Sequence, residues 1–147
     1  MSFRFALAPL LRLRQSIERQ RTLQLQEANL QVSRARETIA RLERSLDDAA
    51  QSDSARLAAG CTAADLQFAS VLRDNLEHFR KELHSDVRKL ELARQKVLGE
   101  YHQAYREREV LENLRARQRH AYQQEQLRRE QQELDASYLL QRWHRRN

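Results

Sequence analysis

Apolar residues recur at steps of three or four through two long stretches of the chain, and this spacing narrows the possible folds more than any other feature. The first series is Leu25, Ala28, Val32, Ala35, Ile39, Leu42, Leu46 and Ala49. The second series is Leu72, Leu76, Phe79, Leu83, Val87, Leu90, Ala93, Val97, Tyr101 and Tyr105. Heptad spacing of this kind places apolar side chains in a narrow stripe along a helix, which a second helix must cover. The pattern therefore predicts two long helices that pack along one seam.

The composition fits long helices and excludes most other folds. Only two glycines and one proline occur among the 147 residues. A β-sheet protein needs β-branched strands separated by frequent turns, and a nucleotide-binding α/β fold needs a glycine-rich loop. With 40% hydrophobic and 33% charged residues, the chain has enough apolar side chains for a seam between helices, but too few for a thick globular core.

One turn signal lies near the middle of the chain, and it makes the two helices antiparallel. Gly60 and Cys61 precede Thr62-Ala63-Ala64-Asp65, which has the form of a capping box at a helix N-terminus. Residues of the two series also pair about this midpoint, since Ile39 lies as far before it as Leu83 lies after it. We therefore predict an all-α fold, a long antiparallel two-helix coiled-coil hairpin that forms a single domain over residues 1–147.

The same signals give the expected boundaries. The first helix is expected at about residues 7–57, the turn at about 58–62 and the second helix at about 62–143. Another apolar run, offset by one residue from the first series, consists of Phe3, Ala6, Leu10, Leu13 and Ile17. This offset predicts local unwinding of the supercoil within residues 18–24. Because the second helix is the longer one, a C-terminal helical overhang without an intramolecular partner is expected from about Arg119.

No residue pattern points to catalysis, a cofactor or a metal ion. The five histidines are scattered, and none has a metal-ligand spacing with another His or Cys. A two-helix rod has no concave pocket that could exclude water from a carboxylate, so pairs such as Asp47-Asp48 are expected on the surface. The lone Cys61 cannot form an internal disulfide, and the longest apolar run is too short to span a membrane. These features indicate a non-enzymatic cytoplasmic protein without a small-molecule substrate.

Positive charge is concentrated at the two ends of the chain. The formal net charge is +6, and 24 of the 27 basic residues are arginine. A hairpin brings the basic ends together in an arginine-rich pole. The planar guanidinium suits carboxylates and phosphates at a binding surface, although a genome rich in arginine codons would explain the bias equally well. No basic patch with interleaved aromatic residues is present, so nucleic acid is the less favoured partner.

Three segments of the chain resemble a known family. They are Phe3–Arg14 (FRFALAPLLRLR), Tyr105–Gln118 (YREREVLENLRARQ) and Arg128–Asp135 (RREQQELD). Together with the chain length, the hairpin order and the longer second helix, they resemble the FliJ family, small coiled-coil proteins of the flagellar type III export apparatus. The resemblance covers essentially the whole chain.

The resemblance implies a stalk-like function. Proteins of this family look like the central stalk of rotary ATPases. Their paired termini insert into the hexameric flagellar export ATPase, the middle of the hairpin reaches the export-gate membrane protein, and export chaperones are also bound. The implied location is the cytoplasm, with peripheral association at the inner-membrane export apparatus. Two other interpretations stay open, namely the equivalent stalk of a virulence injectisome and an RNA- or ribosome-associated basic coiled coil.

Two surfaces follow from the resemblance. The ATPase-facing surface is expected at Leu10, Leu11, Arg14, Arg106, Arg108, Leu111, Leu114, Arg115 and Arg117. The gate-facing surface is expected at Leu42, Leu72, Leu76, Phe79 and Leu83. Because these apolar residues also belong to the predicted seam, we expect most of them to serve the core first.

Overall fold

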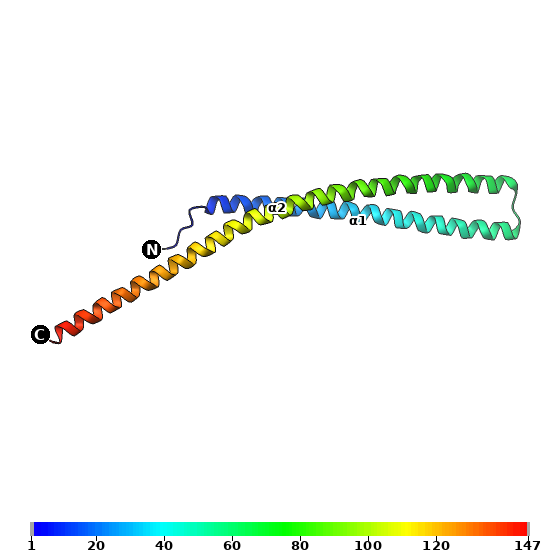
Figure 1. Ribbon diagram of the computed structural model, residues 1–147. Helices are drawn as coiled ribbons and strands as arrows, with labels where there is room; N and C mark the ends of the chain where they lie inside the picture. The colour runs from blue at the N-terminus through cyan, green and yellow to red at the C-terminus, as the bar shows by residue number, and fades with distance from the viewer. Residues whose placement is uncertain (1, 147) are drawn as a thin grey trace. The chain divides into compact units, whose positions relative to one another are not determined.

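The computed structural model describes residues 2–146 and consists of two helices (Figure 1). Helix α1 is Ala8–Ala59 and helix α2 is Ala63–His144. The two helices pack against each other, and no strand occurs among the described residues. The predicted all-α helical hairpin is therefore confirmed. Each helix end lies within two residues of its expected position. The turn is shorter than expected and is confined to residues 60–62.

Local chemistry explains the turn between the helices. Gly60 has a φ of 85°, a left-handed conformation that glycine adopts without steric cost. At the start of α2, the backbone N–H of Asp65 donates to the Thr62 hydroxyl (3.2 Å), and the backbone N–H of Thr62 donates to the Asp65 carboxylate (3.2 Å). This reciprocal pair is the predicted capping box, and it satisfies amide groups that the first helical turn leaves unpaired.

The contacts divide the chain into two units, which we describe separately. The turn unit is Gln20–His102, and the end unit is Met1–Arg19 with Gln103–Asn147. In the turn unit, all eight residues of the first apolar series are buried or half-buried, with Val32 only 2% exposed. The predicted stripe on α1 is therefore confirmed.

The stripe on α2 differs from the prediction within the turn unit. Phe79 and Leu72 are about half exposed, and Ala93 is exposed, whereas Arg80 and Arg94 are half-buried. The observed stripe alternates strictly by four and three, through 76, 80, 83, 87, 90, 94, 97 and 101. Arginine is compatible with such a position because its methylene stem covers apolar neighbours while its guanidinium reaches water.

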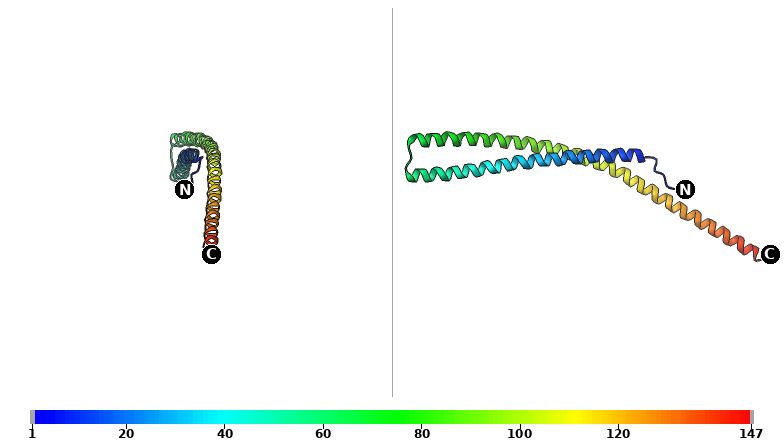
Figure 2. Two further views of the ribbon diagram at one scale, coloured as in Figure 1. Left: turned by 90° about the vertical axis from the view of Figure 1, so that its left-hand side faces the viewer. Right: turned by 180° about the vertical axis from the view of Figure 1, so that it is seen from behind.

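Ion pairs flank the seam of the turn unit. Arg21 pairs with Glu100 (2.7 Å), Arg36 pairs with Glu91, and Arg73 pairs with Asp53. Each pair joins α1 to α2 within the turn unit, where the right-hand view of Figure 2 shows the two helices running alongside each other. Partly exposed pairs of this kind add little stability individually, but they favour one alignment of the helices.

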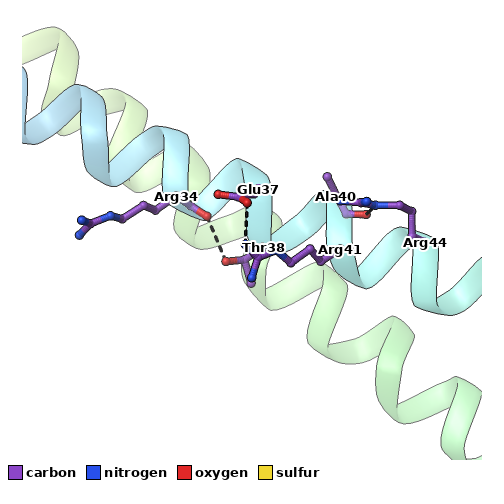
Figure 3. A network of polar contacts seen from close by, with 6 residues as sticks. All are labelled: Arg34, Glu37, Thr38, Ala40, Arg41 and Arg44. Carbon is purple, nitrogen blue, oxygen red and sulfur yellow. Dashed lines mark hydrogen bonds and ion pairs between the residues drawn. The ribbon is translucent and has the colours of Figure 1, made fainter.

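The outward face of α1 bonds within its own helix. The guanidinium of Arg41 donates to Glu37 (2.6 Å), and the hydroxyl of Thr38 donates to the carbonyl of Arg34 (3.0 Å), as Figure 3 shows. Arg44 likewise donates to the carbonyl of Ala40 (3.3 Å). These contacts one turn apart are ordinary for a solvated helix surface.

The end unit has a different seam from the one predicted. Phe5, Leu11 and Ala104 are buried, whereas Leu10 and Leu13 are exposed. The heptad phase of α1 continues without a slip through residues 11, 14, 18, 21 and 25, all of which are buried or half-buried. The expected offset run is therefore wrong, since Ala6, Leu10 and Leu13 are exposed, whereas the expected unwinding within residues 18–24 stays a prediction. Likewise, Ala104 replaces the expected Tyr105 on α2.

The chain before α1 is an extended lead-in, which Figure 2 shows beside the N-terminus. Its Phe3 ring lies 5.8 Å from the ring of Tyr122. Tyr122 therefore has an intramolecular partner, although the sequence placed it in the overhang. Farther along α2, the large apolar side chains are all about two-thirds exposed: Leu127, Leu134, Tyr138, Leu139, Leu140 and Trp143.

The capping box gives a prediction for Thr62→Ala. Loss of the hydroxyl leaves an amide of the first turn of α2 unpaired, so the free energy of unfolding should fall by about 1 kcal/mol. Urea unfolding followed by circular dichroism measures this change. Ser70→Ala removes a hydroxyl from the exposed interior of α2 and serves as the control. Its free energy of unfolding should be unchanged or slightly higher, because alanine favours helix.

The same box gives a pH dependence. The side-chain hydrogen bond from Thr62, and then the bond from its backbone N–H, lower the pKa of Asp65 below its ordinary value. The carboxylate therefore stabilises the folded state above the unfolded pKa of about 3.9, and this contribution disappears as the pH falls through the lower folded pKa. Asp65→Asn should abolish this part of the acid dependence.

Candidate docking surfaces

The end unit contains all nine residues of the expected ATPase-facing surface, but they divide into two groups. Leu11 is 3% exposed and belongs to the core. Arg14, Arg108, Leu111 and Leu114 are half-buried. The residues that present exposed side chains are Leu10, Arg106, Arg115 and Arg117. Only the four exposed residues can offer most of their side-chain surface to a partner without disturbing the hairpin.

Arg108 is the most enclosed charged residue of this group. Its Nε lies 2.5 Å from a carboxylate oxygen of Glu18 on α1, and its Nη1 lies 2.5 Å from Glu112 on α2. The Arg108 and Glu18 side chains are only 18% and 17% exposed, and the guanidinium lies 4.9 Å from the centre of the Tyr105 ring. Desolvation lowers the pKa of Arg108, but the two carboxylates outweigh it and the net pKa is raised. Arg108 therefore joins the helices as a permanent cation.

Two further polar contacts accompany this ion pair. Arg14 on α1 lies 2.5 Å from Glu107 on α2, and the Gln15 amide donates to Glu112 (3.4 Å). Acidic and basic side chains thus occupy places that apolar residues occupy elsewhere in the seam. The sequence prediction missed this because it selected apolar residues at the expected spacing.

One exposed face of α2 in the end unit combines charge with an apolar residue. Arg106, Val110 and Arg117 lie on the same face of α2, since steps of four and seven residues return to nearly the same side of a helix. All three are exposed. We call these three residues the end surface. Val110 was not predicted, and its exposure could not be recognised from apolar spacing alone.

The expected gate-facing residues lie in the turn unit and also divide into two groups. Leu42, Leu76 and Leu83 are half-buried in the seam, whereas Leu72 and Phe79 are about half exposed. Two additional apolar residues of α2, Phe68 and Val71, are still more exposed. We call the exposed set, Phe68, Val71, Leu72 and Phe79, the turn-unit patch. Several exposed apolar residues along one part of a helix are a typical protein-binding feature.

The described residues offer little to other kinds of site. Within residues 2–146, no three His, Cys, Asp or Glu side chains are grouped so that they could hold a metal ion. In that same part of the chain, neither helix is long and apolar enough to cross a membrane. Cys61 is a free thiol, and it is half-buried.

Comparison with known proteins adds one decisive finding. The model of the family described as flagellar FliJ protein matches residues 3–147. The chain belongs to the flagellar FliJ family. Searches among curated proteins and among solved structures gave no match.

Membership in the FliJ family sets the general function. The protein is a component of the flagellar export apparatus, and the family is a non-catalytic part of that apparatus. The resemblance inferred from the three segments of the sequence is thereby confirmed. The roles of individual residues are a separate question, and they depend on which side chains the hairpin leaves exposed.

The enclosed ion pair gives a prediction for Glu18→Ala. Removal of this carboxylate leaves the Arg108 guanidinium poorly compensated, so the free energy of unfolding should fall by about 2 kcal/mol. Urea unfolding followed by circular dichroism measures the change. Glu109→Ala removes an exposed carboxylate of α2 and should change the value by less than about 0.5 kcal/mol. Equal effects of the two substitutions would show that the ion pair contributes no more than ordinary surface charge.

Proposed function

We propose that this FliJ-family protein is a stalk-like coiled coil that joins the hexameric flagellar export ATPase to the export-gate membrane protein. The end unit contacts the ATPase ring, and the turn unit contacts the gate. The protein works in the cytoplasm and associates peripherally with the inner-membrane export apparatus. Escort of export chaperones is a further part of this proposal. The family match over residues 3–147 is the observation that carries it.

The distribution of charge supports different partners for the two units. The end unit has 14 arginines against eight acidic residues, so it carries the whole net charge of +6. The turn unit has 13 basic and 13 acidic residues and is neutral. A cationic surface favours a partner with acidic groups by electrostatic complementarity, whereas a neutral unit with an apolar patch favours a partner with apolar residues.

The burial of the predicted residues decides which of them to test. Leu11, Arg108 and Leu111 also hold the hairpin together, so their substitution would confound loss of binding with loss of structure. The exposed arginines of the end surface avoid this difficulty. We therefore assign the ATPase contact to Arg106 and Arg117, with Val110 between them.

The variant Arg106→Glu with Arg117→Glu tests the ATPase contact. Charge reversal places carboxylates against an acidic partner, so stimulation of ATP hydrolysis by the export ATPase should fall at least about tenfold. Ring formation by the ATPase should fall in parallel. Both are measured with purified proteins over a titration of the variant.

Arg34→Glu with Arg44→Glu is the matched control, because it makes the same change in net charge on an exposed face of α1 in the turn unit. This control should stimulate the ATPase as the parent protein does. If both double variants lose stimulation equally, net charge and not the end surface governs the effect. If the parent protein leaves the ATPase unchanged but binds RNA in a salt-sensitive manner, the RNA-associated interpretation replaces the stalk.

The variant Leu72→Ala with Phe79→Ala tests the gate contact. Both side chains are about half exposed, so the loss of apolar contact should weaken binding to the purified export-gate protein by about tenfold or more. Surface plasmon resonance measures the affinity. Leu92→Ala truncates a leucine of α2 that is more exposed (68%) and lies outside the turn-unit patch, and it should leave the affinity within about twofold. An unchanged affinity of the double variant would remove the patch from the gate contact.

A further inference from the structure

A groove of about 740 Å³ lies in the end unit, where the lead-in meets the start of α1. Its lining combines two kinds of side chain. The apolar part consists of Phe3, Phe5, Ala6, Ala8, Pro9 and Leu11, and the polar part consists of Arg4, Arg12, Gln15 and Arg115. The volume falls within the range of pockets that bind small molecules or short peptide segments. No carboxylate lines the groove.

The three arginines of the groove come from three different segments. Arg4 belongs to the lead-in, Arg12 to α1 and Arg115 to α2. All three are exposed, and among the described residues none of them forms an ion pair with a carboxylate. Three like charges that line one groove raise its positive potential, which attracts an anionic ligand.

The acidic residue closest along α2, Glu112, does not supply this anion. It already pairs with Arg108 (2.5 Å) and accepts from the Gln15 amide (3.4 Å). The hairpin therefore satisfies Arg108 and Arg14 internally, while Arg4, Arg12 and Arg115 stay available to a ligand.

The floor of the groove restricts the chemistry of that ligand. Phe5 and Leu11 line it with only 7% and 3% of their surfaces exposed, so the half-buried Phe3 and the exposed Pro9 offer most of its apolar area. A simple inorganic anion would gain nothing from this apolar floor. A ligand that carries carboxylates together with an apolar side chain would use both the guanidinium forks and the floor.

We propose that this groove binds an acidic peptide segment of a partner protein, with carboxylates on Arg4, Arg12 and Arg115 and an apolar side chain against Phe3 and Pro9. The inference deepens the proposed function and rests on it for the identity of the partner, because Arg115 belongs to both the groove and the expected ATPase-facing surface. Beyond the proposed function, it names the groove as the binding site and carboxylates with an apolar side chain as the groups that are recognised. Arginine serves this role better than lysine, since its planar fork binds both oxygens of a carboxylate.

The probe is a fluorescein-labelled hexapeptide that alternates Glu with Leu, and fluorescence anisotropy with the full-length protein measures binding. Two matched peptides replace every Glu by Gln or every Leu by Ser. The Glu–Leu peptide should bind at least about tenfold more tightly than either relative, because each relative loses one half of the recognition. Unlabelled inorganic phosphate, ATP and a polyuridine RNA should fail to displace it.

The triple variant Arg4→Ala, Arg12→Ala, Arg115→Ala should weaken binding by at least about tenfold. The matched control replaces Arg34, Arg44 and Arg142 by Ala, which removes the same charge from exposed positions outside the groove. It should bind the peptide within about twofold of the parent protein. Circular dichroism should give the same helicity for both triple variants, because all six arginines are exposed.

Several results would overturn the proposal. Equal loss in the two triple variants would mean that total charge attracts the peptide. Equal binding of the Glu–Ser peptide would reduce the groove to an anion site, and displacement by RNA, ATP or phosphate would assign it to a different ligand. The outcome is separate from the ATPase assay. If the parent protein stimulates the ATPase and the Arg106→Glu/Arg117→Glu variant does not, but the parent fails to bind the peptide, the groove proposal alone is refuted. If the parent protein binds the peptide but does not stimulate the ATPase, the stalk proposal alone is refuted.

Discussion

A seam only one side chain wide holds α1 against α2, and this narrowness restricts which residues can occupy the remaining positions between the helices. Six apolar residues are buried among the described part of the chain, and none of its large side chains is fully enclosed. A two-helix contact cannot exclude water as a globular core does, so its remaining positions must tolerate partial hydration. Arginine and glutamate meet that requirement, because their stems pack while their charged groups pair or reach water. The enclosed pair of Arg108 with Glu18 is the clearest example.

The fold could be predicted from the sequence because several independent signals agree. The stripe on α1 in the turn unit contains an apolar residue at every step, and the capping box marks the start of α2. The stripe on α2 was misplaced where an apolar residue stands beside an arginine. Phe79 next to Arg80 and Ala93 next to Arg94 are such cases, and choosing the apolar residue broke the strict alternation of four and three. Regular spacing was thus the better guide, since neighbouring helices fix the phase of the whole stripe.

The candidate surfaces were harder to predict, because spacing does not reveal whether a residue serves the seam or a partner. Leu10 and Leu11 are adjacent leucines, yet Leu11 is buried and Leu10 is exposed. The buried stripe of α1 runs through residues 11, 14, 18, 21 and 25, so it includes Leu11 and leaves Leu10 outside. The exposed Val110 and Phe68 escaped notice for a related reason. Each lies off the seam, and only the position of the partner helix shows that nothing in the hairpin covers it.

The arginines show most clearly how structure separates architecture from recognition. The sequence gives 14 of them in the end unit with no means of ranking them. In the folded chain, Arg14 and Arg108 have carboxylate partners across the helices, so their charges are already compensated. Arg106 and Arg117, like those of the groove, are exposed without such a partner among the described residues. Because an uncompensated cation is hydrated but not yet committed to a contact, it can form a charge-assisted bond with a partner at a lower cost than an arginine that must first break an internal pair. Binding should therefore depend on the exposed arginines and stability on the paired ones.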